Sequence, residues 1–432
     1  MTRREVLSLS AAWLCSSVKG QSSPDATLRI GAITLDLGPK KSARTIAYNG
    51  QVPGPVLRVK EGQLFTVDVV NETPDHELVH WHGLHIPSDV DGAHEEGTPP
   101  VAPRETRRYA FLARPPGTRW YHSHNSMSGK EFHRGTYTGQ FGLFLVEPAS
   151  DPARYDLDIQ IMMHEWDPAL VDDDIEYKLF SINGKMLGAG EPVRVRQAQR
   201  VLFRLVNASA TATHRMALPL HSFEVVSLDG NALPKPVTVP VIELGPGERA
   251  DAVVEMTHPG VWVLGSTRDK DRAAGMGIVI EYADQHGSPR WAAPPAFNWD
   301  YSLFGETQPH ADPDGRFPMV FKESSGSGKW TINGKSFPHT DPLMVKADRR
   351  YRLIFDNQSA MAHPVHLHRH TFEITRFVDK PTSGVFKDVV MVPGWKQVEV
   401  DLIASNPGPS LFHCHQQLHM DRGFMTLMQY SS

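Results

Sequence analysis

Short alternations of apolar and polar residues recur along most of the chain. Val56–Val59, Val193–Arg196 and Leu343–Lys346 are examples, and each is bounded by residues that favour turns. Because successive side chains of a β-strand point to opposite faces, this alternation predicts strands with one buried face. Few segments show the period of 3.6 residues that an amphipathic helix requires. The pattern therefore predicts an all-β protein built from antiparallel β-sandwiches.

One strand-and-turn unit occurs three times along the chain. Ile46–Gly50, Ser181–Lys185 and Thr331–Lys335 each contain an Asn-Gly turn, and a Pro and then an alternating strand follow each of them. Each copy continues into a second strand that ends near an asparagine: Asn71, Asn207 and Asn357. A repeat of this kind predicts three consecutive domains.

The repeat places these domains at residues 24–148, 155–285 and 318–432. Residues 285–318 are rich in Pro, Asp and Gly, and we expect them to form a linker over the surface. No segment of the three domains approaches the ~20 consecutive apolar residues that a membrane-spanning helix needs. The sequence therefore predicts no membrane span.

Composition and charge narrow the class of partner. The chain is 40% hydrophobic and 22% charged, with a net charge of -5 and no basic run, so a nucleic-acid partner is not expected. Cys15 and Cys414 are the only cysteines, which excludes a disulfide framework. Residues 1–20 are interpreted as an export signal, because Thr2–Leu7 resembles the twin-arginine consensus and a short apolar run follows it. The expected location is the periplasm or the exterior.

Histidine is the residue whose distribution indicates chemistry. The chain has 22 histidines. Four pairs have the form His-x-His: His80 with His82, His122 with His124, His366 with His368, and His413 with His415. On a strand, residues i and i+2 point to the same face with Cα atoms ~6.6 Å apart, so each pair presents two imidazoles side by side. Four such pairs predict a site for several metal ions.

The pairs are divided between the first and third copies of the repeat. The second copy has Ala217 and Pro219 where the third has His366 and His368, and it has no histidine at residues 265–267, which match the third copy's His-Cys-His motif. We therefore expect the first and third domains each to supply half of a metal site. The second domain is expected to be a spacer without metal ligands.

Cys414 points to a second kind of metal site. It lies between His413 and His415, so the period of two turns its side chain to the opposite face. Two imidazoles, a thiolate and a weak axial position form the blue-copper arrangement, and His363 and His419 can supply the imidazoles. Zinc is the competing metal, but four histidine pairs exceed what one zinc ion binds, and zinc has no redox use for the link through Cys414.

Four segments resemble the copper motifs of the multicopper oxidases, the family of laccases, copper-efflux oxidases, bilirubin oxidases and spore-coat laccases. The segments are His80-Trp-His-Gly83, Trp120-Tyr-His-Ser-His124, His363-Pro-Val-His-Leu-His368 and His413-Cys-His-Gln-Gln-Leu-His419. The resemblance implies three consecutive cupredoxin-like Greek-key β-sandwich domains. It also implies four copper ions and an enzyme that passes electrons from a small-molecule reductant to O₂, which is reduced to water.

The resemblance also assigns ligands. It implies that His363, Cys414 and His419 hold a type 1 copper, and that His80 and His366 hold a type 2 copper. Six further histidines would hold the binuclear type 3 pair: His82, His122, His124, His368, His413 and His415. The type 2 and type 3 ions would form a trinuclear cluster between the first and third domains.

Some positions depart from the family pattern or suggest further roles. Phe424 stands where many bacterial members have an axial Met, which predicts a higher type 1 potential unless Met425 or Met420 reaches the copper. Met420 also occupies a position that is acidic in copper-efflux oxidases, and Asp421 is adjacent to it. Asp91 matches a family Asp that feeds protons to reduced oxygen, a role that suits a carboxylate near a metal; a simple turn role before Gly92 is the alternative.

Other histidines and aromatic residues are given structural interpretations. His85 and His370 lie close to ligand motifs and could support or border them. His214 matches the position of His363 in a copy without its partners, so it is interpreted as a packing residue. Trp120 and Phe412 precede motifs and are expected to lie in the core.

The substrate class stays open between two readings. A laccase-type oxidase of phenols and aromatic amines is favoured, because the chain has no Met-rich insert such as copper-efflux members often carry. A metal oxidase acting on Cu(I), Fe(II) or Mn(II) is the alternative. A copper nitrite reductase lacks the eight cluster histidines, and a copper-free structural relative would not keep every expected ligand.

Overall fold

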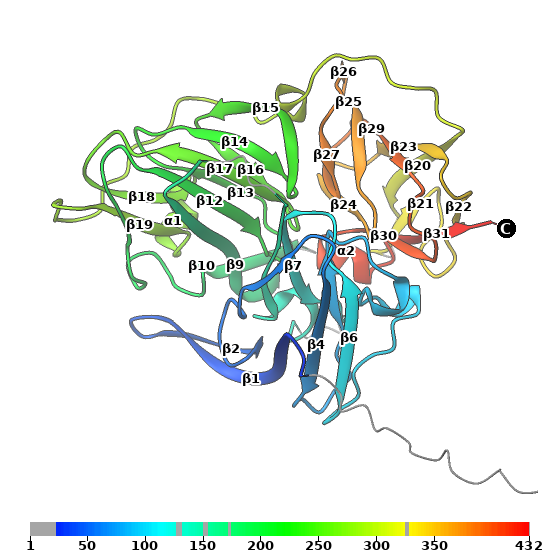
Figure 1. Ribbon diagram of the computed structural model, residues 1–432, viewed down its shortest axis with the longest axis horizontal. Coiled ribbons are helices and arrows are strands. Elements are labelled where there is room, and N and C mark those ends of the chain that lie inside the picture. Colours follow the sequence, from blue (N-terminus) through cyan, green and yellow to red (C-terminus); the bar gives the residue numbers. More distant parts are fainter. Residues whose placement is uncertain (1–22, 127–131, 150–153, 172–173, 325–327, 432) are drawn as a thin grey trace, which may run out of the picture.

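Three β-sandwiches follow one another along the chain in the computed structural model (Figure 1). The structure describes residues 23–126, 132–149, 154–171, 174–324 and 328–431. The predicted export signal, with Cys15, lies outside these residues. Strands dominate the described part of the chain, and its two α-helices, α1 (Asp269–Ala273) and α2 (Gln417–Asp421), are short.

The first sandwich packs a sheet ordered β2-β1-β4-β6 against one ordered β3-β8-β7-β5. Its strands are β1 (Ala26–Gly38), β2 (Lys41–Tyr48), β3 (Leu57–Lys60), β4 (Leu64–Asn71), β5 (Val79–His82), β6 (Thr106–Leu112), β7 (Gly117–Ser123) and β8 (Phe141–Glu147). Its connections contain the short 3-10 helices η1 (Ser88–Val90), η2 (His94–Glu96) and η3 (Gly135–Tyr137).

The second sandwich has sheets ordered β10-β9-β12-β17-β14-β15 and β11-β19-β18-β13-β16. Its strands are β9 (Leu157–Val171), β10 (Asp174–Ile182), β11 (Val193–Val195), β12 (Arg200–Asn207), β13 (His214–Ala217), β14 (Phe223–Leu228), β15 (Asn231–Val239), β16 (Ile242–Leu244), β17 (Arg249–Glu255), β18 (Val261–Ser266) and β19 (Gly277–Tyr282).

The third sandwich follows the 3-10 helix η4 (Tyr301–Phe304) and has sheets ordered β21-β20-β23-β29-β25-β26, with β27 also paired to β25, and β22-β31-β30-β24-β28. Its strands are β20 (Gly315–Glu323), β21 (Trp330–Ile332), β22 (Leu343–Val345), β23 (Arg350–Asn357), β24 (His363–Leu367), β25 (Phe372–Phe377), β26 (Lys380–Pro381), β27 (Phe386–Lys387), β28 (Val389–Val392), β29 (Gln397–Ile403), β30 (Ser410–Cys414) and β31 (Met425–Tyr430).

Each sandwich mixes parallel with antiparallel strand pairs, which corrects the prediction of purely antiparallel sheets. In the first sandwich β1 runs parallel to β4, and β3 runs parallel to β8. The other sandwiches repeat this as β9 with β12, β11 with β19, β20 with β23 and β22 with β31. Crossing connections of Greek-key type bring together strands that run in the same direction. Alternation reports which face of a strand is buried and says nothing about the direction of its neighbour.

The repeated Asn-Gly segments form tight hairpin turns in all three copies. Asn49, Asn183 and Asn333 have φ angles of 53°, 51° and 53°, and the glycines that follow them have φ angles of 71°, 74° and 80°. Two successive residues with positive φ form a type I′ turn, which Asn-Gly adopts with little strain. The motif thus sets the same hairpin in each sandwich.

Burial alternates along the strands as the sequence pattern predicts. β23 buries Tyr351, Leu353 and Phe355, and the residues between them are less buried. One apolar cluster runs through the second and third sandwiches, and it includes Tyr301 and Phe304 of η4. The stretch predicted to be a surface linker is therefore anchored in the core, because its two aromatic rings gain more from burial than from lying over the surface.

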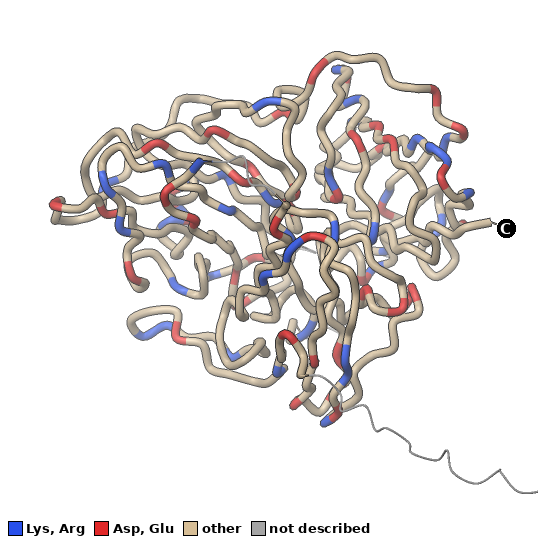
Figure 2. Tube along the Cα trace, viewed as in Figure 1, with Lys and Arg blue, Asp and Glu red and all other residues tan. Residues whose placement is uncertain are grey.

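The three sandwiches meet near the centre of the molecule. Figure 1 shows the second sandwich (green) beside the third (orange to red), with the first (blue to cyan) below both. β7 of the first sandwich approaches β24, β30 and α2 of the third (Figure 1). Basic and acidic residues are interspersed along the chain in all three sandwiches (Figure 2). Within the part of the chain that the structure describes, no helix has the length and apolar character needed to cross a membrane.

Candidate metal centre

Strand register explains how histidines far apart in the sequence come together. β5 pairs antiparallel with β7 so that His80 lies opposite His122, and β24 pairs with β30 so that His366 lies opposite His413. These two strand pairs are equivalent in the repeat and belong to the first and third sandwiches. Every residue of β5 and β24 is buried. The four His-x-His segments therefore face one another at the interface between the two sandwiches.

Eight buried imidazoles converge at this interface. Three pairs of ring nitrogens lie within 3.4 Å of each other: His80 Nε2 with His366 Nε2, His82 Nδ1 with His122 Nε2, and His368 Nε2 with His413 Nε2. His415 and His124 complete the set. The ring centroid of His415 is 5.1 Å from that of His82, and the ring centroid of His124 is 5.3 Å from that of His413. The structure thus brings together all eight histidines predicted for the cluster.

The rings are held in the neutral form that can bind a metal. Burial, followed by repulsion between neighbouring imidazoles, lowers the pKa of His82, His122, His366 and His413. The pKa of His368 falls to about 4, again chiefly because of burial. A neutral imidazole keeps a lone pair on one nitrogen, which is the group that a metal requires.

Hydrogen bonds fix which nitrogen of six of the rings faces the interior. Four rings donate through Nδ1 to backbone carbonyl oxygens at 2.7–3.0 Å: His80, His122, His366 and His413. His368 donates through Nδ1 to Asp91 Oδ2 at 2.9 Å. His82 differs, because it donates through Nε2 to Asp388 Oδ1 at 3.0 Å. Five rings therefore present Nε2 to the interior, and His82 presents Nδ1.

Several ring nitrogens are buried without a partner. His124 Nε2 and both ring nitrogens of His415 have no hydrogen-bond partner among the described residues. Burying an imidazole nitrogen in this way is costly unless another group satisfies it. Lone pairs on neutral imidazoles suit transition metals such as copper. The donor set therefore fits metal binding, and its number of imidazoles exceeds what one ion can use.

Two carboxyl groups lie behind the rings. Asp91 Oδ2 is 2.9 Å from His368 Nδ1 and 3.1 Å from His80 Nδ1. Burial works against its ionisation, but His80 and His368 hold the pKa of Asp91 below its usual range. Glu96, in η2, lies 3.4 Å from the same His368 Nδ1 and accepts a hydrogen bond from the backbone N–H of Leu411. Burial and the charge of Asp91 raise the pKa of Glu96, so the two carboxyls favour different protonation states.

A second donor group surrounds Cys414. Its Sγ is 3.8 Å from His363 Nδ1 and 3.6 Å from His419 Nδ1, and these two nitrogens are 3.2 Å apart. His363 Nε2 lies 2.9 Å from Ser359 Oγ, which accepts its proton and leaves Nδ1 free to face the thiol. The ring centroid of Trp330 is 4.5 Å from the ring centroids of both imidazoles. One thiol and two imidazoles in this arrangement match the equatorial donors of a blue-copper site.

Phe424 occupies the predicted position beside this group. Its ring centroid is 5.1 Å from that of His363, and the side chain is fully buried. Cys414 and Phe424 belong to the main apolar cluster, whereas Met425 and Met420 belong to a separate one. Of these three side chains, Phe424 is the one that shares an apolar cluster with Cys414.

Met420 instead lines a small cavity beside the cluster histidines. Gln417 and Thr136 line the same cavity, and Gln417 Oε1 accepts hydrogen bonds from the backbone N–H and hydroxyl of Thr136. Gln417 Nε2 donates to Asp421 Oδ2 at 3.0 Å. A thioether cannot carry a proton, and the carboxyl of Asp421 is linked to this cavity through Gln417.

The remaining histidines near the motifs have protein partners. His85 Nε2 pairs with Thr371 Oγ1 at 2.9 Å, and His370 Nε2 pairs with Tyr430 Oη at 2.9 Å. His214 Nε2 pairs with Ser209 Oγ at 2.8 Å, which repeats the contact of His363 in a sandwich without its metal-binding partners. The aromatic ring of Trp120 stacks on the imidazole of His122, with centroids 4.2 Å apart; like Phe412, it is buried.

Four supporting residues were missed by the sequence reasoning: Ser359, Glu96, Asp388 and Arg249. One signal was present, since Lys387 and Asp388 interrupt an otherwise apolar run from Val385 to Val392. Charged residues inside a buried strand need partners, which predicts a buried ion pair. Their partners lie in other domains, and the sequence alone does not identify them.

Three family models, each described as multicopper oxidase, match residues 30–151, 172–280 and 312–432. The chain belongs to the multicopper oxidase family. It is therefore a copper-dependent oxidoreductase that uses O₂. The multicopper oxidase MmcO of Mycobacterium tuberculosis is 28% identical over 457 residues, which cover 94% of this chain and 86% of the relative.

Solved structures of multicopper oxidases share the fold. Fet3p, described as a multicopper oxidase that functions in iron import, has a TM-score of 0.78 at 19% identity, covering 94% of this chain and 90% of its own. The laccase-like CueO of Ochrobactrum sp. also has a TM-score of 0.78, at 22% identity, covering 94% of this chain and 96% of its own. The predicted three-domain cupredoxin-like fold is thereby confirmed.

Proposed function

We propose that this multicopper oxidase is a laccase-type enzyme with four copper ions. His363, Cys414 and His419 would hold the type 1 ion, and His80 and His366 the type 2 ion. Six histidines would hold the type 3 pair: His82, His122, His124, His368, His413 and His415. Bound copper supplies the one-electron oxidation of a phenol or aromatic amine and the reduction of O₂ to water.

The observation that carries the proposal is the covalent link between the two donor groups. The Sγ of Cys414 faces His363 and His419, while His413, the preceding residue, directs Nε2 toward His368 Nε2 at 3.0 Å. His413 Nδ1 also donates to the carbonyl oxygen of Cys414 at 2.9 Å. A hydrolytic metal enzyme has no use for such a link, whereas an oxidase that separates substrate oxidation from O₂ reduction needs one.

The chain's own residues orient the donors and manage protons. Ser359 fixes the Nδ1-facing form of His363, and Asp91 orients His80 and His368 through their Nδ1 protons. Asp91 is held ionised by His80 and His368, and its Oδ1 is buried without a hydrogen-bond donor among the described residues, so this oxygen is open to a proton from a neighbouring acid. Glu96 lies beside it and favours its protonated form. We assign Asp91 the role of proton donor to reduced oxygen.

The surroundings of the type 1 group favour an organic reductant. Trp330 lies 4.5 Å from both imidazoles and 5.7 Å from the Phe424 ring, so aromatic side chains flank the donors. Phe424 would supply no donor atom to a type 1 ion, which would raise the oxidising power of the site. Removing one electron from a phenol or an aromatic amine requires a site with a high reduction potential. Oxidation of a metal ion is the alternative, since Fet3p is described as functioning in iron import.

The proposal includes export to the periplasm or the exterior. Its support is the Thr2–Leu7 segment and the apolar run that follows it. Replacing Arg3 and Arg4 together with Lys should retain the protein inside the cell, and comparison of cell fractions would check this. Export unaffected by the double substitution would contradict a twin-arginine route.

The test is an absorption spectrum of the copper-loaded protein together with O₂ uptake. We expect a strong visible band that disappears in a Cys414→Ser variant, four copper ions per chain, and O₂ uptake driven by a phenol. Uptake driven mainly by Cu(I) or Fe(II) would replace the laccase assignment with a metal oxidase. A colourless protein that holds its copper and consumes no O₂ would overturn the proposal.

A further inference from the structure

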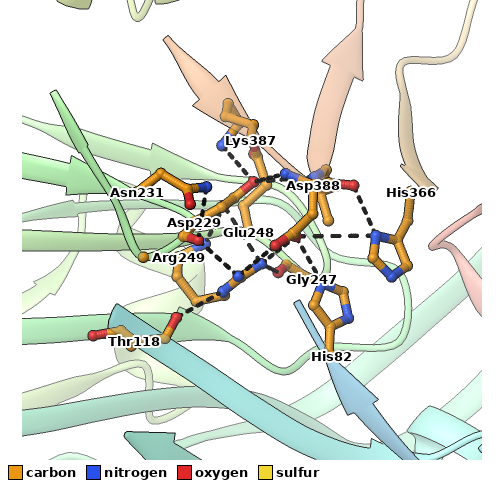
Figure 3. A network of polar contacts seen from close by, with 12 residues as sticks. His82, Thr118, Asp229, Asn231, Gly247, Glu248, Arg249, His366, Lys387 and Asp388 are labelled. Atoms are coloured by element: carbon orange, nitrogen blue, oxygen red, sulfur yellow. Dashed lines mark hydrogen bonds and ion pairs between the residues drawn. The ribbon is translucent and has the colours of Figure 1, made fainter. Parts of the chain in front are cut away.

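The middle sandwich, predicted to be a spacer, reaches the trinuclear histidines. Figure 3 shows Arg249, Gly247 and Asp229 of this sandwich gathered around Asp388 of the third, with His82 of the first on its other side. All three sandwiches therefore meet in one buried polar network directly behind the cluster.

Arg249 holds Asp388 through both carboxylate oxygens. Its Nη2 is 2.7 Å from Asp388 Oδ2, and its Nη1 bonds to Oδ1, the same oxygen that accepts the proton of His82 Nε2 at 3.0 Å. A two-pronged contact of this kind fixes the plane of a carboxylate. Because Oδ1 is fixed as the acceptor for Nε2, the lone pair of His82 lies on Nδ1, facing His122 Nε2 at 3.4 Å.

The network balances its charges away from water. Three fully buried cations, Arg119, Arg249 and Lys387, lie among three buried carboxylates, Asp229, Glu248 and Asp388. Lys387 Nζ is 2.9 Å from Asp229 Oδ2 and 3.0 Å from Glu248 Oε1. Removing one member would leave a buried charge uncompensated, so the arrangement strongly favours one geometry.

Gly247 brings the middle sandwich against a second cluster histidine. A Cβ on Gly247 would lie 2.7 Å from Cδ2 and 2.9 Å from Nε2 of the His415 ring, and its φ of 85° is one that side chains rarely adopt. The Gly247 carbonyl also accepts a hydrogen bond from Arg249 Nη1 at 3.2 Å. The same loop therefore packs on His415 and is tied to the arginine that fixes His82.

The two histidine triads of the cluster have different supports. His82, His122 and His415 form one triad, with ring centroids 5.1–5.5 Å apart. Arg249 and Gly247 act on two of its members. The other triad is His124, His368 and His413. Its carboxyl support comes from the first sandwich, where Asp91 and Glu96 lie against His368.

We propose that the middle domain positions the type 3 copper site of His82, His122 and His415, with Arg249 and Gly247 as its positioning residues. Arg249 selects the ring nitrogen that His82 offers to the metal, and Gly247 sets the place of the His415 ring. The opposite type 3 site does not depend on this domain. The inference rests on the proposed function, since it needs the eight histidines to be copper ligands.

An Arg249→Lys variant tests the proposal. Lysine keeps the charge but cannot hold both oxygens of Asp388 and the Gly247 carbonyl at once. We expect copper affinity at one site to fall by about 10- to 100-fold, as for other residues that orient metal ligands. Dialysis against a chelator should then remove one copper per chain, and its former partner, no longer magnetically coupled, should give a new EPR signal. The visible type 1 band should stay.

Arg204→Lys is the matched control. Arg204 is another arginine of the middle sandwich that bridges to the first, through Thr118 Oγ1 at 2.8 Å. It also pairs with Asp158 of its own sandwich at 2.8 Å, and none of its printed contacts is to a cluster histidine. An Arg249→Lys protein that keeps the copper content and EPR spectrum of this control overturns the proposal. Wild-type protein that fails to bind the cluster copper at all would instead refute the proposed function.

Two further measurements do not depend on how Arg249→Lys folds. Gly247→Ala pushes directly on His415 and should cause the same selective copper loss; full retention counts against the proposal. In metal-free wild-type protein, ¹⁵N NMR of the imidazoles should show His82 protonated on Nε2, with its signals assigned by comparison with His82→Gln. Protonation on Nδ1 would overturn the assignment of Arg249.

Discussion

Replacing Asp91 by Asn separates two roles of this carboxylate. Asn keeps the shape and one acceptor oxygen but removes the charge and the site for a proton. Asp91 Oδ2 accepts a hydrogen bond from His368 Nδ1 at 2.9 Å and lies 3.1 Å from His80 Nδ1, whose proton it shares with the Asp91 carbonyl oxygen. A hydrogen bond to a charged group contributes about 1.5–3 kcal/mol and a neutral one about 0.5–1.5 kcal/mol, so each bond weakens by about 1 kcal/mol.

Weakening both contacts reduces the support of the two imidazoles by about 2 kcal/mol in total. At about 1.4 kcal/mol per factor of ten, this corresponds to a loss of roughly 30-fold in copper affinity. That value lies within the range of about 10- to 100-fold typical of residues that orient metal ligands. Loss of a proton donor would lower turnover by a further factor of about 10²–10⁴, and excess copper would not restore it.

The assay therefore measures copper retention against a chelator, and then O₂ uptake at full copper occupancy. Asp89→Asn is the control, because Asp89 is an exposed aspartate two residues away in η1. If Asp91→Asn retains copper like the control, the carboxylate does not support His80 and His368. If the fully loaded variant turns over at the wild-type rate, the proton role is excluded.

Three further predictions concern other parts of the molecule. Phe424→Met should lower the type 1 reduction potential and change the free energy of unfolding by less than about 1.5 kcal/mol, because Met has a similar volume; redox titration with an unchanged or higher potential would contradict this. Ser359→Ala should leave His363 Nε2 without its acceptor, at a cost of about 1–3 kcal/mol, and the visible band should bleach faster under chelator than in wild type. Burial lowers the pKa of His164 from 6.5, so the folded state stays uncharged where the unfolded state takes up a proton. Its contribution to stability is therefore complete above pH 6.5 and falls by up to about 1.4 kcal/mol per pH unit below it. His164→Asn, which can still donate to the Ala208 carbonyl, should flatten the dependence of the urea midpoint on pH, and an equal slope would exclude His164.

Much of the candidate site could be read from local patterns. The His-x-His spacing works because neighbouring strands present every second side chain to one face, and the structure gathers the predicted histidines and Cys414 into two donor groups. The Asn-Gly turns likewise depend on only two adjacent residues, both of which tolerate a positive φ. The hairpins at Asn49, Asn183 and Asn333 therefore follow directly from the sequence. Features formed by residues that are close together in the sequence were therefore predictable.

The residues that support the candidate metal donors were not predictable in this way. His82 and Asp388 are 306 residues apart, and their contact depends on Arg249 from a third domain. Glu96 could be recognised as a partner of His368 only in the folded protein, where the two side chains lie 3.4 Å apart. The pKa of Glu96 is raised by burial and by the charge of Asp91, and both effects arise only on folding. No periodicity encodes such a contact, because it joins surfaces that the chain forms separately.

The sequence by itself determined the all-β class, the threefold repeat and the candidate metal donors, because each depends on spacings of a few residues. Only the tertiary structure decided the parallel strand pairs and the anchoring of Tyr301 and Phe304 in the core. It also decided that the middle domain packs behind His82 and His415. Strand alternation constrains which face is buried, whereas the packing of three finished sandwiches selects which buried charges meet and which ring nitrogen is left to bind a metal.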